Sequence, residues 1–336
     1  MSPDPRVLDA EPGPAAVGSL PGGAPGLEAP YRDALIERET ATPPPPLDTP
    51  FRRFLADFFE SRVAAAAVLT LAALVLLALA TPLFVPQNPY DLAQVDVLDN
   101  KLPPGSESQT GYTYWLGTDG AGRDLLSAIL YGLRISLLVG AASGVLAMGL
   151  GLAIGLFAAY VGGRTETAIM RLVDLQLSFP AVLVALLLVA LLGRGVDKII
   201  LALVIVQWAY YARTVRGNAL VERRKDYVAA ARSLGLGRGR VLFRHILPNC
   251  LAPLIVVVTV QTAHAIALEA TLSFLGVGLP QTEPSLGALI ANGFAYVTSG
   301  LYWISLFPGL ALLVTIVAIN LVGDQLRDVL NPRLSR

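Results

Sequence analysis

The sequence predicts an all-α, polytopic membrane protein with six membrane-spanning helices. Hydrophobic residues make up 54% of its 336 residues and charged residues only 15%, whereas a soluble domain carries about 25% charged residues. The apolar residues are gathered into six long runs, and a helix needs about 20 such residues to cross the hydrocarbon core of a bilayer. Strands of a membrane β-barrel would instead alternate apolar and polar positions, so we expect helices.

Residues 1–50 differ in composition from the rest of the chain. They contain 12 of the 24 prolines, end in TPPPPLDTP and include few large apolar side chains. Such a segment buries too little apolar surface to offset the entropy lost on ordering. We therefore interpret residues 1–50 as a disordered, proline-rich tail and residues 51–336 as the membrane domain. A docking site for a polyproline-binding partner is the less favoured interpretation of the tail.

The six apolar runs predict the spans, although they differ in clarity. The second run carries glycines four residues apart, a spacing that lets helices approach closely. Residues 123–133, before it, have the amphipathic spacing of an external interfacial helix. The third run has a polar first half, and the fourth is the shortest. We place the spans at about 63–85, 135–161, 167–192, 198–212, 250–275 and 301–322.

Arginine and lysine residues lie mostly on one side of these predicted spans. With the N-terminus inside, nine of them fall between the fourth and fifth spans, and further arginines flank the first span and end the chain. The outside segments hold only five. By the positive-inside rule, both termini and the loop at 221–249 are therefore expected in the cytoplasm.

The predicted loop at 221–249 is basic and contains several glycines. VERRKDYVAAARSL has good helix formers, and Gly235 follows where a helix end favours a left-handed glycine. A second short helix is expected over RVLFRHI, and Pro248 then stands at the head of the next span, where a missing N–H costs little. Five apolar residues lie near the alanines: Leu234, Leu236, Val241, Leu242 and Phe243. They suit docking against another protein, although a solvated loop that obeys the positive-inside rule would explain the arginines.

The same loop resembles the EAA loop of ABC importer permeases. In that family this loop is the coupling helix, which seats in a cleft of the cytoplasmic ATPase subunit. Ala229 stands where the family usually has Glu, so we expect a charged or hydrogen-bonding contact to the ATPase to be missing at that position. The residues that match the motif are Ala230, Ala231, Gly235, His245, Leu247 and Pro248.

Two further stretches narrow the resemblance to the dipeptide, oligopeptide and nickel branch of these importers. YWLGTDGAGRDLLSAILYGLRISLLVG leads into the second span, and ATLSFLGVGLPQTEPSLGALI follows the fifth, where Leu286 replaces the usual Trp. The resemblance covers about residues 60–333. Of the two permease subunits in such systems, the chain looks most like the second. It implies the type I ABC importer permease fold in the inner membrane. Peptides are the commonest substrate of this branch; nickel or another small solute is the alternative.

The resemblance also implies a set of partners. The chain is expected to pair with a homologous permease subunit in the lipid bilayer. Two cytoplasmic ATP-binding subunits would dock below it, and an extracytoplasmic substrate-binding protein would deliver the substrate. None of the three lysines follows a glycine as in a phosphate-binding loop, so ATP hydrolysis is assigned to the partners. The sequence has no Cys/His metal cluster and no nucleophile motif, so we expect no catalytic, cofactor or metal site and no nucleic-acid partner.

Four polar residues within the predicted spans are candidates for the translocation pathway, because polar side chains are costly in a bilayer. They are Asp174, Gln261, His264 and Glu269. Asp174 lies three residues after Arg171 and is expected to pair with it. The residues on the fifth span are equally compatible with hydrogen bonds between helices. A self-powered secondary transporter and an intramembrane enzyme are the rival functions, but the sequence has no convincing repeat and no catalytic constellation.

Overall fold

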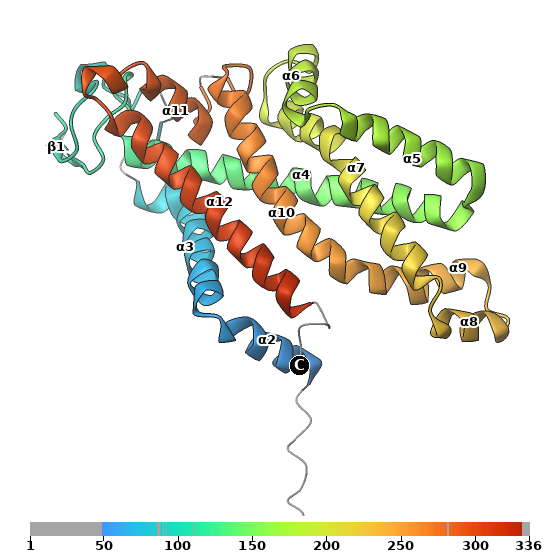
Figure 1. Ribbon diagram of the computed structural model, residues 1–336. Helices are drawn as coiled ribbons and strands as arrows, with labels where there is room; N and C mark the ends of the chain where they lie inside the picture. The colour runs from blue at the N-terminus through green and yellow to red at the C-terminus, as the bar shows by residue number, and fades with distance from the viewer. Residues whose placement is uncertain are drawn as a thin grey trace, which may run out of the picture. The chain divides into compact units, whose positions relative to one another are not determined.

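The computed structural model describes residues 49–85, 88–89, 91, 93–109, 111–280 and 282–330. Almost all of the predicted proline-rich tail, residues 1–50, therefore lies outside the described residues. The chain divides into two units, Met1–Thr49 and Pro50–Arg336. The described part of the second unit consists mostly of α-helices (Figure 1).

Within the described residues, five helices are long and apolar enough to cross a membrane, and a pair of helices joined at a bend is a sixth candidate span. Each of the six predicted spans has a counterpart among them, and the all-α class is confirmed. In chain order they are α3 (Arg62–Phe84), α4 (Leu125–Val161), the pair α5 (Gly163–Ser178) and α6 (Ala181–Leu192), α7 (Val196–Glu222), α10 (Leu247–Phe274) and α12 (Trp303–Val329).

Shorter elements lie at the two ends of these helices (Figure 1). At one end, here called the loop end, are α2 (Pro50–Glu60), α8 (Asp226–Ser233), α9 (Arg238–Val241) and the π-helix η2 (Leu242–Ile246). At the opposite end are η1 (Val97–Asp99), the antiparallel strands β1 (Ser106–Glu107) and β2 (Thr113–Tyr114), α11 (Leu286–Phe294) and η3 (Val297–Ser299).

The helix α4 merges two segments that the sequence predicts separately. The interfacial helix expected at 123–133 and the span expected at 135–161 form one helix of 37 residues, capped by Asp124. The helix predicted to lead into the second span is therefore confirmed, and it is continuous with that span because RDLLSAILYGLR contains no proline. Its interfacial position outside the membrane stays a prediction. At 1.5 Å per residue α4 is about 55 Å long, well beyond the roughly 30 Å of a hydrocarbon core. It must therefore be strongly tilted or project from the bilayer.

Glycines on α4 let α7 approach it closely. A Cβ atom at Gly151 would lie 2.4 Å from the Cβ of Tyr211, and one at Gly155 would lie 2.5 Å from the carbonyl oxygen of Ala212. Larger residues at these two positions would therefore push α7 away. The role predicted for the four-residue glycine spacing is confirmed for this helix pair.

The third predicted span, 167–192, is broken into two helices. α5 ends at Ser178, α6 begins at Ala181, and the two are bent by 91°. Pro180 explains the break, because it lacks a backbone N–H and disfavours a helical conformation at the residue before it. That residue, Phe179, has extended backbone angles (φ −89°, ψ 140°). The prediction of one uninterrupted span is corrected accordingly.

The helix α7 is much longer than the predicted span at 198–212, and its second half contacts α5. Arg213 forms an ion pair with Asp174, and the Nε atom of Arg216 lies 2.7 Å from Oε1 of Glu166. The predicted pairing of Asp174 with Arg171 is wrong, because Asp174 meets Arg213 across the helix interface. Both ion pairs stabilise the position of α5 against α7.

Candidate functional site

The loop between α7 and α10 is folded, and its first helix ends as the sequence predicts. Gly235 has a φ of +72°, a left-handed conformation that favours glycine. Its N–H donates to the carbonyl of Arg232 (2.9 Å), and the N–H of Leu236 donates to the carbonyl of Ala231 (3.2 Å). These two bonds form a Schellman motif, which satisfies the last carbonyls of α8. The predicted helix end and glycine turn are confirmed.

One face of this loop is buried and the other is exposed. The buried residues pack against the loop-end cores of α4, α7 and α10; they are Val228, Ala231, Val241, Leu242 and Ile246. On α8, Ala229 and Ala230 are exposed, and Leu234 is 81% exposed; these three residues are here called the α8 outer face. Of the apolar residues expected to favour docking, Val241 and Leu242 instead belong to the core, and Leu234 and Phe243 are exposed.

The second half of the loop runs into α10 through a π-helix rather than through a break. The N–H of Leu247 donates to the carbonyl of Leu242, five residues back. Pro248 has no N–H to donate, and the side chain of Asn249 instead donates to the carbonyl of His245 (2.7 Å). Arg238–Phe274 is therefore one continuous helical element, and the predicted short helix merges with the fifth span. Single π turns of this kind are frequent at functional sites.

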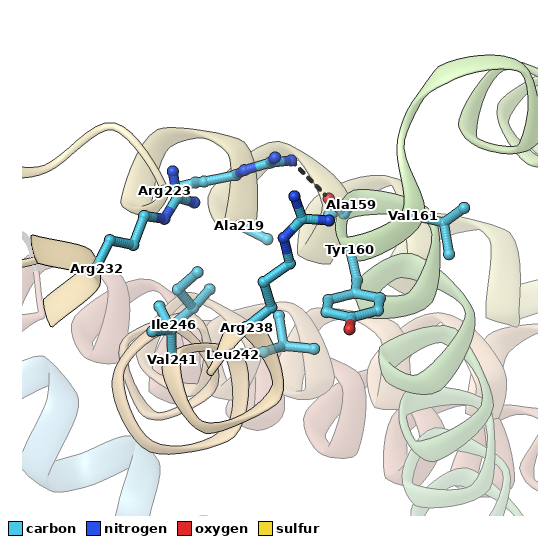
Figure 2. Close-up of a pocket in the computed structure, with 10 residues that line it drawn as sticks. All are labelled: Ala159, Tyr160, Val161, Ala219, Arg223, Arg232, Arg238, Val241, Leu242 and Ile246. Atoms are coloured by element: carbon cyan, nitrogen blue, oxygen red, sulfur yellow. Dashed lines mark hydrogen bonds between the residues drawn. The ribbon is translucent and has the colours of Figure 1, made fainter. Parts of the chain in front are cut away.

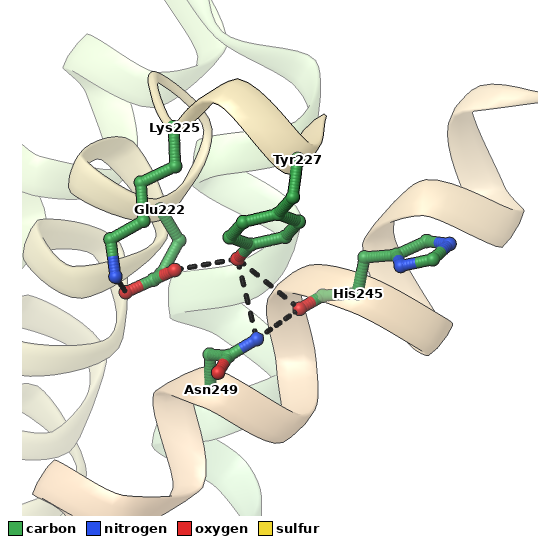
Figure 3. Close-up of polar contacts among 5 residues, drawn as sticks. All are labelled: Glu222, Lys225, Tyr227, His245 and Asn249. Carbon is green, nitrogen blue, oxygen red and sulfur yellow. Dashed lines mark hydrogen bonds and ion pairs between the residues drawn. The ribbon is translucent and has the colours of Figure 1, made fainter. Parts of the chain in front are cut away.

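A polar network joins the two ends of the loop (Figure 3). Tyr227, at the start of α8, donates its hydroxyl to Glu222 at the end of α7 (2.5 Å), and Glu222 pairs with Lys225 (2.6 Å). Asn249 on α10 donates to the Tyr227 hydroxyl (3.3 Å). Partial burial and the hydrogen bond to Glu222 raise the pKa of Tyr227 to about 12. Sequence reasoning missed this network, because its members become neighbours only when α7, α8 and α10 converge.

Of the four pathway candidates, Glu269 is fully buried within the described chain. Its carboxylate accepts hydrogen bonds from Ser136 on α4 (2.8 Å) and Ser273 on α10 (2.9 Å). Ser285, the N-cap of α11, adds a third side-chain hydrogen bond. Glu269 therefore connects three helices near the opposite end.

Within the described residues, no hydrogen bond joins the other three candidates to Glu269. Gln261 is buried, and its backbone carbonyl accepts a hydrogen bond from Gln207 on α7 (3.2 Å). His264 is exposed on the surface of α10, and Asp174 is exposed and paired with Arg213 on α7. The structure thus does not gather the four candidates into one site.

The fold and the loop define the class of this protein, a multi-pass helical membrane subunit. Residues 151–336 match the family described as binding-protein-dependent transport system inner membrane component. Residues 49–104 match the N-terminal TM domain of oligopeptide transport permease C. Because the first match covers more than half of the chain, the chain belongs to the family of binding-protein-dependent transport system inner membrane components.

Similar proteins cover most of the chain. It is 47% identical to a putative peptide transport system permease protein of Brucella suis biovar 1 (strain 1330), over 69% of this chain and 76% of the relative. It is 38% identical to the di/tripeptide transport system permease protein DppC of Pseudomonas aeruginosa (strain UCBPP-PA14), over 85% and 93%. It is 36% identical to the glutathione transport system permease protein GsiD of Pectobacterium atrosepticum, over 85% and 92%.

Solved structures support the fold. The inward-facing MetNI methionine ABC transporter aligns with a TM-score of 0.51 at 19% identity, over 61% of this chain and 97% of that chain. At this identity the likeness establishes the fold alone. The predicted ABC importer permease fold is therefore confirmed.

Proposed function

We propose that this chain is a permease subunit of an ATP-driven peptide importer and that its α8 outer face docks on an ATP-hydrolysing partner. Membership of the family supports the transport role. Relatives named for the transport of peptides, di- and tripeptides and glutathione support a peptide substrate. The chain itself is non-catalytic in this proposal, and hydrolysis belongs to two cytoplasmic subunits.

The observation that carries the proposal is the exposed apolar face of a loop that is otherwise packed and hydrogen-bonded. Leu234 is 81% exposed, yet the turn beside it is held by the Schellman motif at Gly235. An apolar surface held rigidly in the open is typical of a protein interface. Because Ala229 stands where the family usually has Glu, no carboxylate at this position can contact the partner. We therefore expect docking to rely on apolar contacts, and on Leu234 above all.

The proposed orientation places the loop end in the cytoplasm. Between residues 222 and 249 the chain has seven arginines and lysines against two carboxylates, and cytoplasmic loops carry such an excess. The elements of the opposite end would then face the substrate-binding protein outside. A homologous permease subunit would complete the pathway within the bilayer.

Motion of the partner would reach the membrane through α7 and α10. The network around Tyr227 joins α8 to both helices, and the core under α8 packs against them. A displacement of α8 would therefore move the loop ends of α7 and α10 together. Coupling in this sense requires that the partner bind the loop differently in two states.

For the pathway, we propose that His264 contributes to its lining, because its side chain is exposed on α10. Gln261 and Glu269 are better suited to fixing helix positions, because both are buried within this chain. Asp174 is compatible with both roles: its side chain is exposed, as a lining residue requires, and its ion pair with Arg213 also holds α5 against α7.

The test of the docking face is Leu234→Asp in the complete transporter, with Leu234→Met as the control. Because Leu234 is exposed, neither change should impair membrane insertion. Leu234→Asp places a carboxylate in an apolar interface and should reduce co-purification of the ATPase subunits at least about tenfold, which corresponds to about 1.4 kcal/mol. Leu234→Met should retain them. Equal recovery with both variants would show that the α8 outer face is not the docking surface.

A further inference from the structure

A basic pocket lies between the loop and the end of α4 (Figure 2). Its volume is about 260 Å³. Arg223 comes from the end of α7, Arg232 from α8 and Arg238 from α9. Figure 2 shows Arg223 and Arg238 reaching toward Ala159 and Tyr160 at the end of α4, while Arg232 extends from the other side. Three separate elements thus bring three guanidinium groups to one pocket.

The positive charge of this pocket is largely uncompensated. Arg223 donates from Nη1 to the carbonyl of Ala159 (3.1 Å), which fixes that side chain but leaves its charge. Within the described residues, the side chains of Arg232 and Arg238 have no hydrogen-bond or ion-pair partner, and none of the described residues that line the pocket is a carboxylate. The nearby acid Glu222 is already bonded to Lys225 and Tyr227.

The rest of the lining is mostly apolar and comes from the end of α4 and from α7, α9 and η2. Val161 is 47% exposed and Tyr160 is 44% exposed, and Val241, Leu242 and Ile246 also line the pocket. Guanidinium groups bind phosphate oxygens in a bidentate fork. A free phosphate would use the arginines alone, whereas a phospholipid would place its phosphate on them and its glycerol and upper acyl chain on the apolar residues.

We propose that this pocket binds the phosphate of an anionic phospholipid from the cytoplasmic leaflet. The assignment to that leaflet rests on the orientation given under the proposed function. Basic pockets at the cytoplasmic ends of membrane helices suit anionic headgroups. A lipid bound here contacts α4, α7, α8 and α9 together, so it stabilises the loop in one position relative to α4. Anionic lipid would thereby favour one state of the coupling loop.

The experiment uses the complete transporter in phosphatidylcholine nanodiscs with and without phosphatidylglycerol. Native mass spectrometry measures the phosphatidylglycerol retained by the complex. The double variant Arg232→Gln/Arg238→Gln is compared with Arg240→Gln/Arg244→Gln, which removes the same charge from the same loop outside the pocket. The first should weaken retention about 30-fold, the effect of two cationic contacts with an anionic lipid, and the second should match the wild type. Equal losses in both variants would overturn the proposal.

Two further measurements distinguish a phospholipid from the other candidate occupants of the pocket, which are free phosphate and the protein partner. Inorganic phosphate should not displace phosphatidylglycerol at millimolar concentration; displacement would identify a site for free phosphate and overturn the lipid assignment. In phosphatidylcholine alone, Arg232→Gln/Arg238→Gln should leave the recovery of the ATPase subunits unchanged. A loss there would assign the pocket to the protein partner instead. Peptide uptake by the wild type is measured separately, so failure of the transport proposal would be distinguishable from failure of lipid retention.

Discussion

The loop end and the opposite end of the helices use polar and apolar side chains in contrasting ways. At the opposite end, Glu269 is fully buried and bonded by serines from three helices. Asp99 is buried there too and accepts a hydrogen bond from the Tyr114 hydroxyl (2.9 Å). At the loop end, the ion pair of Glu222 with Lys225 lies near the surface, while apolar Leu234 is exposed.

This difference indicates which end is built to hold its shape and which is built to meet a partner. A buried carboxylate that is fully hydrogen-bonded fixes the helices around it, because any displacement leaves polar groups unsatisfied. An exposed apolar face above a packed core is stable alone and gains more burial when a partner covers it. Changes at the loop end should therefore affect coupling, and changes around Glu269 should affect stability.

The largest functional effect is expected at Gly235. Gly235→Val places a β-branched residue at a φ of +72°, which costs about 1–2 kcal/mol. No atom outside its neighbours lies within 4 Å of the added Cβ, so the effect comes from backbone strain that disrupts the end of α8. The variant should lose the ATP hydrolysis that transport stimulates, measured in the reconstituted complex, while its membrane insertion stays normal.

Gly235→Asn is the matched control, because Asn tolerates the left-handed conformation. It should retain most of the stimulated hydrolysis. If Gly235→Val also retained the stimulated hydrolysis, the coupling role of the loop would be disproved. The two ends of the molecule would then not differ in their effect on coupling.

The largest effect on stability is expected at Glu269. Glu269→Ala leaves the hydroxyls of Ser136 and Ser273 without their acceptor and opens a cavity among three helices. We expect a loss of about 3 kcal/mol, measured by thermal unfolding of the purified complex. Glu269→Gln keeps the shape and one acceptor oxygen, so it should lose less than half as much. If both variants unfolded like the wild type, the buried cluster would not hold the opposite end.

Local sequence signals predicted the loop better than they predicted contacts between helices. Gly235 was predictable because its left-handed turn depends on a few neighbouring residues. Pro180 also indicated a helix break in the sequence. A break inside an apolar run does not change the hydropathy by which spans are placed, so the run was still predicted as one span. The partner of Asp174 was not predictable, since Arg213 lies 39 residues away and meets it only after α5 folds against α7.

The candidate site shows the same division. The Ala-Ala pair, Gly235 and Pro248 follow from local pattern, whereas the exposure of Leu234 and the burial of Leu242 depend on how α8 and η2 pack. The basic pocket could not be predicted for the same reason. Arg223, Arg232 and Arg238 are separated along the chain and converge only through the fold.

The smallest effect is expected at Tyr227. A change here tests whether hydrogen bonds or the apolar core link α8 to α7 and α10. Tyr227→Phe removes the hydroxyl that Glu222 accepts and that Asn249 contacts. Because the side chain is 36% exposed, we expect a loss of about 0.5 kcal/mol. Thermal unfolding should change little, while the gain in hydrolysis on adding substrate-loaded binding protein should fall measurably. A normal gain would show that α8 is linked to α7 and α10 by its apolar core alone.

The pH dependence of this variant gives the direction of the effect. The pKa of Tyr227 is about 12 in the folded protein, above its ordinary value of 10.0. As the pH rises past 10, the unfolded chain therefore loses this proton before the folded protein does. The stabilisation from the protonated hydroxyl is therefore fully present below pH 10 and lost as the pH rises toward 12. The difference in unfolding temperature between wild type and Tyr227→Phe should shrink over that interval. A constant difference would mean that the hydroxyl is solvated rather than held by Glu222, and the two ends would then differ less than their hydrogen bonds indicate.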